Sequence, residues 1–84
     1  MYNIEIEHTA VHFLKRLHQL EYDRIIRGLR QLADTPRPNS CRKLKSGKND
    51  YRIRIGDWRI VYEVDDGMQT VRILRIALRK DVYR

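Results

Sequence analysis

Eighty-four residues with a mass of 10.2 kDa leave room for one small domain, which we place at residues 1–84. A composition of 42% hydrophobic and 35% charged residues excludes a disordered chain. No apolar run approaches a membrane span and no secretory signal opens the chain, so we expect a cytoplasmic protein. The formal net charge is +7, and residues 42–84 hold twelve basic against six acidic side chains. This excess favours a polyanion partner such as nucleic acid, although an acidic protein surface is an alternative.

The amino-terminal part predicts one strand and two helices. Apolar and polar side chains alternate over residues 2–7, which is typical of a strand with one wet face. Thr9 is the expected N-cap of a first helix. A second helix is predicted over residues 21–34, ending before Pro36 and Pro38. The apolar positions are Ala10, Phe13, Leu14, Leu17 and Leu20 in the first helix, and Tyr22, Ile25, Leu29, Leu32 and Ala33 in the second. Because the helices are close in sequence, we expect an antiparallel helical hairpin.

The remaining chain predicts three strands, over residues 51–55, 58–64 and 71–77. Gly56-Asp57 and Asp65-Asp66-Gly67 separate them and are typical of tight turns. The expected element order is therefore β-α-α-β-β-β. We interpret this as a small α+β domain, an antiparallel sheet with the helical hairpin packed on one face.

Alternation along these strands predicts a basic open face. If the helices cover the side that carries Ile53 and Ile60, then Arg52, Arg54 and Arg59 point the other way. With matching register, Arg75 and Arg79 of the last strand join them, which makes five arginines on one face. For any single arginine a solvated strand position is the simpler interpretation. Together they form a surface that binds a phosphodiester and stabilises charge that builds on its oxygens.

Arginine stays protonated, so a nuclease built on this face needs another group to move a proton. Tyr83 is the nearest candidate, because positive charge from Arg79 and Arg84 lowers the pKa of a phenol. Its alternative role is an apolar anchor for the end of the chain.

No metal site or cofactor is predicted. His8, His12 and His18 fall in or beside the first helix, and the first two are four residues apart, but no acidic or cysteine partner stands at a telling distance. Cys41 is interpreted as a loop thiol, and Asp65-Asp66 as part of a turn.

These residues resemble a known family. The segment from Tyr51 to Asp65, YRIRIGDWRIVYEVD, and the ending Arg79-Lys80-Asp81-Val82-Tyr83 are similar to the RelE/ParE superfamily of toxins. For its RelE-like branch the resemblance implies a type II toxin that is held by an antitoxin and cuts mRNA in the ribosomal A site. It also implies that the substrate 2′-hydroxyl attacks the adjacent phosphate and that the reaction needs no metal.

The resemblance assigns roles to individual residues. It makes Arg54, Arg59, Arg79 and Tyr83 catalytic and places Arg52, Lys43, Lys45 and Arg75 on the RNA. Arg59 would stabilise the pentavalent phosphate, Arg79 the leaving oxygen, and Tyr83 would stack on a base or transfer a proton. Two departures from relatives involve three positions: Leu78 stands where many relatives have histidine, and Arg52 and Arg54 stand where some have lysine. Both departures remove a candidate general base.

Two other functions remain open at this stage. A ParE-like protein of the same fold would inhibit DNA gyrase and leave RNA intact. A non-catalytic RNA-binding module would use the arginines as phosphate contacts only.

Overall fold

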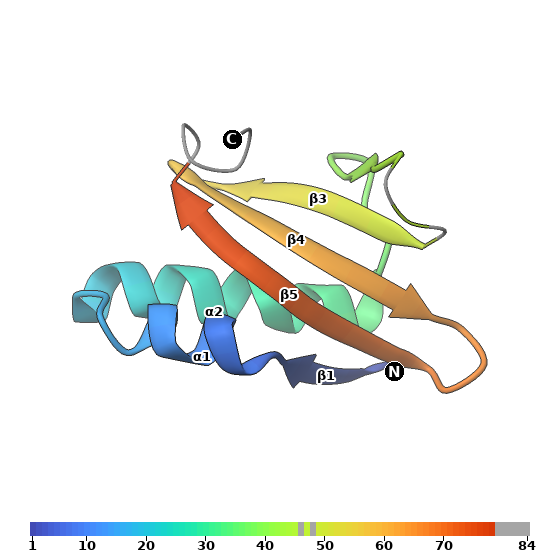
Figure 1. Ribbon diagram of the computed structural model, residues 1–84, viewed down its shortest axis with the longest axis horizontal. Coiled ribbons are helices and arrows are strands. Elements are labelled where there is room, and N and C mark those ends of the chain that lie inside the picture. The colour runs from blue at the N-terminus through green and yellow to red at the C-terminus, as the bar shows by residue number, and fades with distance from the viewer. Residues whose placement is uncertain (46, 48, 79–84) are drawn as a thin grey trace.

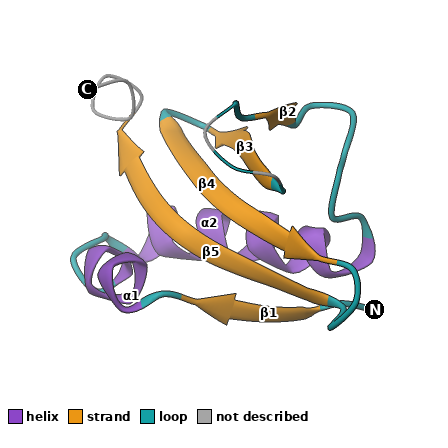
Figure 2. Ribbon diagram, turned by 45° about the vertical axis from the view of Figure 1, so that its right-hand side comes forward, coloured by secondary structure: helices purple, strands orange, loops and turns teal. Residues whose placement is uncertain are grey.

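The computed structural model describes residues 1–45, 47 and 49–78, which form one mixed sheet with two helices on one side (Figure 1). The elements in chain order are β1 (Asn3–Ile6), α1 (His8–Leu14), α2 (Gln19–Asp34), β2 (Arg42–Lys43), β3 (Asp50–Ile55), β4 (Trp58–Asp65) and β5 (Thr70–Leu78). The strand order is β1-β5-β4-β3-β2, and Figure 2 shows β1 and β2 at opposite edges. No helix in this described part of the chain is long and apolar enough to cross a membrane.

The predicted α+β fold is confirmed, with differences at the sheet edges. The pairs β2–β3, β3–β4 and β4–β5 are antiparallel, but β1 runs parallel to β5. Parallel neighbours need a long connection between them, and here both helices and the other strands supply it. The two-residue strand β2 was not predicted, because two residues carry no measurable periodicity.

The helix boundaries also differ from the prediction. Thr9 is not the N-cap: α1 begins at His8 after Glu7, and no side chain caps it. Helix α2 begins at Gln19, two residues earlier than expected. Leu20 was assigned to the buried face of the first helix, but it lies in α2 and is 85% exposed. The chain leaves the helical path between the two helices, so the apolar spacing of the first does not continue into the second.

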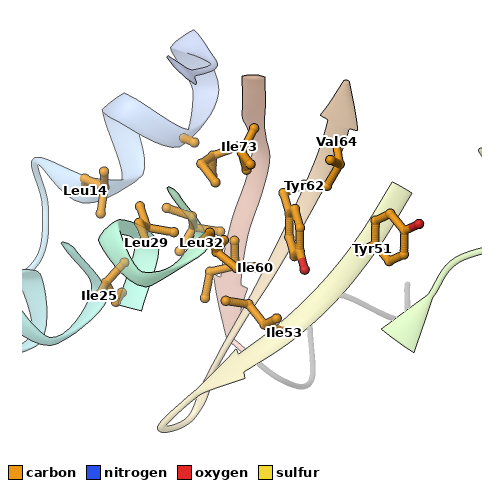
Figure 3. Packing of buried hydrophobic residues seen from close by; sticks show 13 residues of the cluster. Leu14, Ile25, Leu29, Leu32, Tyr51, Ile53, Ile60, Tyr62, Val64 and Ile73 are labelled. Atoms are coloured by element: carbon orange, nitrogen blue, oxygen red, sulfur yellow. The ribbon is translucent and has the colours of Figure 1, made fainter. Parts of the chain in front are cut away.

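The core lies between the helices and the sheet. Leu14 of α1 and Leu29 of α2 point toward Ile60 and Ile73 of the central strands (Figure 3). These side chains are at most 5% exposed, and burying each one contributes roughly 1.5–3 kcal/mol. The face opposite the helices is thus left for polar side chains.

A bulge in β5 decides which of its side chains reach that opposite face. The pairing shifts between Val61 and Tyr62, whose partners are Arg75 and Ile73, so Leu74 is an extra residue. Before the bulge Ile73 faces the helices, and after it Ile76 does so, while Arg75 faces away. This break in alternation explains why the middle of the strand is apolar on both faces in sequence.

A polar network holds the end of the sheet at which β4 turns into β5. Arg37, in the loop after α2, donates to both carboxylate oxygens of Asp66, at 3.1 and 2.8 Å, and to the Tyr51 hydroxyl at 2.8 Å. The Tyr2 hydroxyl donates to the same carboxylate at 2.6 Å. These bonds, first from Arg37 and then from Tyr2, hold the pKa of Asp66 below its usual range. The network joins β3, two loops and the amino terminus.

Candidate RNA-binding face

Strand pairing brings arginines from four strands onto the face away from the helices. In one row across the sheet, Arg42 pairs with Arg52, Arg52 with Val61, and Val61 with Arg75. Paired residues share a face of the sheet, so all four side chains lie on the open side. Together with the next row they form the arginine cluster, which we define as Arg42, Arg52, Arg54, Arg59 and Arg75.

The next row contains the most buried arginine. Arg54 pairs with Arg59, and Arg59 pairs with Ala77. The Arg54 side chain is exposed, and its Nε donates to the Gly56 carbonyl at 3.1 Å. Arg59 is only 8% exposed and stands on the central strand β4. The expected shared face of Arg52, Arg54, Arg59 and Arg75 is therefore confirmed as geometry.

Burial makes Arg59 the strongest local cation of the cluster. A guanidinium stays protonated, so it keeps its charge when water is removed. Coulomb interactions strengthen as the local dielectric falls. Arg52, Arg59 and Arg75 each interact with another group of the protein. Guanidinium groups held on neighbouring strands are suited to a phosphoryl group that gains negative charge.

The opposite end of the same face is acidic. The Arg72 guanidinium lies 3.5 Å from Glu5, 3.6 Å from Glu7 and 3.6 Å from Glu63. Asp50 pairs with Glu63 in the sheet and extends this row of carboxylates. We define the carboxylate cluster as Glu5, Glu7, Asp50 and Glu63 around Arg72. A phosphate is attracted to one end of the open face and repelled from the other.

The structure places Lys43 on the other face of the sheet from the arginine cluster. Lys43 pairs with Tyr51, a core residue, so it lies on the other side of β2 from Arg42. Lys43 and Lys45 are both exposed near this edge. Arg79 and Tyr83 lie outside the described residues. The structure thus brings together Arg52, Arg54, Arg59 and Arg75 on one face, and places Lys43 on the other.

Sequence reasoning missed Arg42 and Arg24. Arg42 joins the cluster only through the short strand β2, which alternation does not detect. Arg24 of α2 reaches the β3–β4 turn, where a Cβ on Gly56 would lie 2.9 Å from its Nη1 atom. Gly56 has a φ of +60°, which glycine adopts without strain. The turn therefore lies against a helix arginine, a contact for which the sequence carries no signal.

Among the described residues, no three or more His, Cys, Asp or Glu side chains are grouped closely enough to enclose a metal ion.

Trp58, predicted as core, is half-buried: its indole packs edge-on against the Phe13 ring, with 5.1 Å between the ring centroids, and its Nε1 donates to Glu21 at 3.1 Å. These aromatic rings serve packing on the helix side and do not reach the open face.

Comparison with known proteins identifies the family. A family model described as the ParE toxin of type II toxin-antitoxin system, parDE, matches residues 4–83. The chain belongs to the RelE/ParE toxin family. The curated Toxin RelE of Mycobacterium tuberculosis is 34% identical over 88 aligned residues, covering 99% of this chain and 87% of that protein. The family resemblance seen in the sequence is confirmed.

Solved RelE structures share the fold. RelE in the archaeal RelE–RelB complex from Pyrococcus horikoshii is 27% identical, with a TM-score of 0.84 over 95% of this chain and 97% of that one. The RelB–RelE antitoxin–toxin complex from Methanococcus jannaschii contains a chain that is 28% identical, with a TM-score of 0.73 over 94% of both. This RelE-like toxin therefore has the same arrangement of sheet and helices as these relatives.

Proposed function

We propose that this RelE-like toxin is an endoribonuclease that cuts mRNA in the A site of the ribosome and so stops translation in the cytoplasm. The observation that carries the proposal is the arginine cluster, with buried Arg59 at its centre. The similarity to a curated RelE toxin at 34% identity supports the same branch of the family.

The proposed reaction is attack by the substrate 2′-hydroxyl on the adjacent phosphorus. A bond forms between O2′ and phosphorus, and the bond from phosphorus to O5′ breaks. Negative charge builds on the phosphoryl oxygens as the pentavalent species forms. In this proposal Arg59 stabilises that charge, while Arg52 and Arg54 hold and orient the backbone. This route draws its stabilisation from guanidinium groups and needs no metal or cofactor.

Proton transfer is assigned outside the arginine cluster, since arginine is not a base at neutral pH. We propose that Arg79 stabilises the leaving O5′ oxygen, and that Tyr83 stacks on a base or transfers a proton. Arg75 contacts the RNA backbone from the same face. Lys43 and Lys45 contact RNA or the ribosome from the β2 edge. Leu78 pairs with Trp58, which places it on the helix side of the sheet.

The second candidate is inhibition of DNA gyrase, which the match to the ParE family model favours. The arginine cluster favours the first candidate, because a surface of several phosphate-binding groups is typical of RNA contact. A module that binds RNA without cutting it would use the same arginines, and its binding would survive the loss of Tyr83.

We further propose a cognate antitoxin as partner. The related RelE chains from Pyrococcus horikoshii and Methanococcus jannaschii were solved in complexes with RelB. An antitoxin segment that folds on binding and carries acidic side chains would match the basic surface. Co-purification with the product of a neighbouring short reading frame tests this pairing.

Primer extension on a defined mRNA in a purified translation system tests the proposed activity. We expect cuts only when ribosomes are present, at the codon in the A site. Arg59→Ala and Arg79→Ala are each expected to abolish both the cuts and growth arrest. If the folded protein arrests growth without cutting mRNA, inhibition of DNA gyrase becomes the favoured function. A supercoiling assay would then test that inhibition directly.

A further inference from the structure

Two histidines converge on the surface of α1, away from the arginine cluster. His8 and His12 are one helical turn apart, and both are exposed. Their Nε2 atoms lie 3.0 Å apart, the ring planes meet at 88°, and the ring centroids are 4.4 Å apart. Helix α1 can be followed in Figure 2, where it lies beside β5. Nothing in the proposed RNA chemistry uses this pair.

A hydrogen bond joins the two Nε2 atoms, which brings both nitrogens to one place on the surface. In a head-to-head N–H···N hydrogen bond, the centroids would be separated by the N···N distance plus about one ring radius for each ring, roughly 5.3 Å in total. The observed centroid distance of 4.4 Å is shorter, so the rings approach obliquely. Two nitrogens that share a metal ion at a right angle would have centroids about 4.5 Å apart, using an N–metal distance of about 2.05 Å. The observed pair fits the second arrangement.

The ligand type indicates the class of metal. The 3.0 Å between the nitrogens is a hydrogen-bond distance, and a small movement of these exposed side chains would bring both to the roughly 2.9–3.3 Å that two ligands of one ion need. Imidazole in tetragonal or octahedral geometry suits Ni²⁺ and Cu²⁺. We propose that His8 and His12 form a two-ligand site for Ni²⁺ or Cu²⁺.

The site is open to further ligands. In the described part of the chain no third His, Cys, Asp or Glu completes a closed metal group, so water or a partner's side chain fills the other positions. Binding would cross-link the first turn of α1, a helix whose start has no side-chain cap. An ion that binds only the folded helix raises the stability of the protein by mass action.

Isothermal titration of the untagged, full-length chain with NiCl₂ tests the site directly. We expect one Ni²⁺ per chain and a rise in Tm when Ni²⁺ is added. His8→Ala and His12→Ala should each weaken binding at least about tenfold. His18→Ala is the matched control, since His18 is exposed and lies outside the pair. Binding that survives both pair variants, or that is lost equally in the control, overturns the proposal.

A second pair of measurements separates the site from a folding effect. ZnCl₂ titration should give weaker binding than CuCl₂, because nitrogen ligands bind Cu²⁺ more tightly than Zn²⁺. Electron paramagnetic resonance of bound Cu²⁺ should show two equivalent imidazole nitrogens in the unmodified chain. A tighter fit to Zn²⁺, or a spectrum with fewer than two nitrogens, contradicts the assignment. Circular dichroism of each variant confirms that α1 and the rest of the fold persist.

Discussion

The two ends of the open sheet face are built from the same strands and carry opposite charge. At one end Arg52 and Arg75 flank the neutral Val61 across three strands. At the other end Arg72 is surrounded by carboxylates, with Glu5 and Glu63 as its cross-strand partners. The same residue type thus stands among carboxylates at one end of the face and beside other arginines at the other. The comparison teaches that strand register, and not arginine content alone, decides which part of the face is basic.

The largest expected effect follows from removing the buried cation. Arg59→Ala should lower the rate of ribosome-dependent mRNA cleavage by about 100-fold or more, because a buried donor to the transition state is lost. Initial rates on programmed ribosomes measure it. Arg72→Ala is the matched control: it is an arginine of the same face, and its loss should lower the rate only a few-fold, because the acidic end then repels RNA more strongly. Equal losses in the two variants would end the distinction between the two ends.

A smaller but still large effect is expected when the arginine end is made to resemble the carboxylate end. Val61→Glu places a carboxylate directly between Arg52 and Arg75. We expect RNA affinity to fall about 10- to 100-fold, and the dependence of affinity on salt to become shallower. Fluorescence anisotropy with a short single-stranded RNA over a salt series measures both. Val61→Gln supplies similar bulk without charge, and a loss as great as that of the glutamate variant would indicate a steric cause.

The converse change should have a modest effect. Glu63→Gln removes one carboxylate from Arg72 and leaves its shape unchanged. RNA affinity should rise a few-fold, because the acidic end then repels the backbone less. The same anisotropy assay detects this change. Unchanged affinity at low salt would show that the carboxylate cluster does not limit where RNA lies.

The smallest effect is expected in the polar network at the far end of the sheet, and it concerns thermal stability. Asp66→Asn removes the partner of Arg37 and should lower the Tm at pH 7 by about a few degrees. Because the folded-state pKa of Asp66 is lowered, its contribution is present above the unfolded pKa near 4 and is lost as pH falls through the folded value. The Tm difference between variant and parent should therefore shrink below pH 4. Thermal melts from pH 2 to 7 measure it, and a constant difference would contradict the assigned cause.

Much of this arrangement could be predicted from the sequence. Strand alternation placed Arg52, Arg54 and Arg59 on one face, because side chains on a strand alternate regardless of context. The position of Arg75 on this face was also predicted, but the bulge at Leu74 was not. Because of that bulge, Ile73 faces the helices while Arg75 faces the open side. Bulges depend on how two strands pair and leave no local pattern.

Other features depended on contacts between distant segments. Arg42 joins the cluster through a strand of two residues, and the parallel direction of β1 follows from the path of the whole chain. The burial of Arg59 was not predicted either, since alternation gives a side chain its face and not its exposure. Leu20 was misplaced because a break between the helices reset the apolar spacing.

Photo-crosslinking from the open face tests the central claim most directly, namely that mRNA lies on the arginine end. A photoreactive benzoyl-phenylalanine is placed either at Val61, inside the arginine cluster, or at Asn3, beyond the carboxylate cluster on β1. After irradiation of the toxin bound to mRNA-programmed ribosomes, the predicted result is an mRNA crosslink from position 61 and none from position 3. A crosslink from position 3 with none from position 61 would contradict the account.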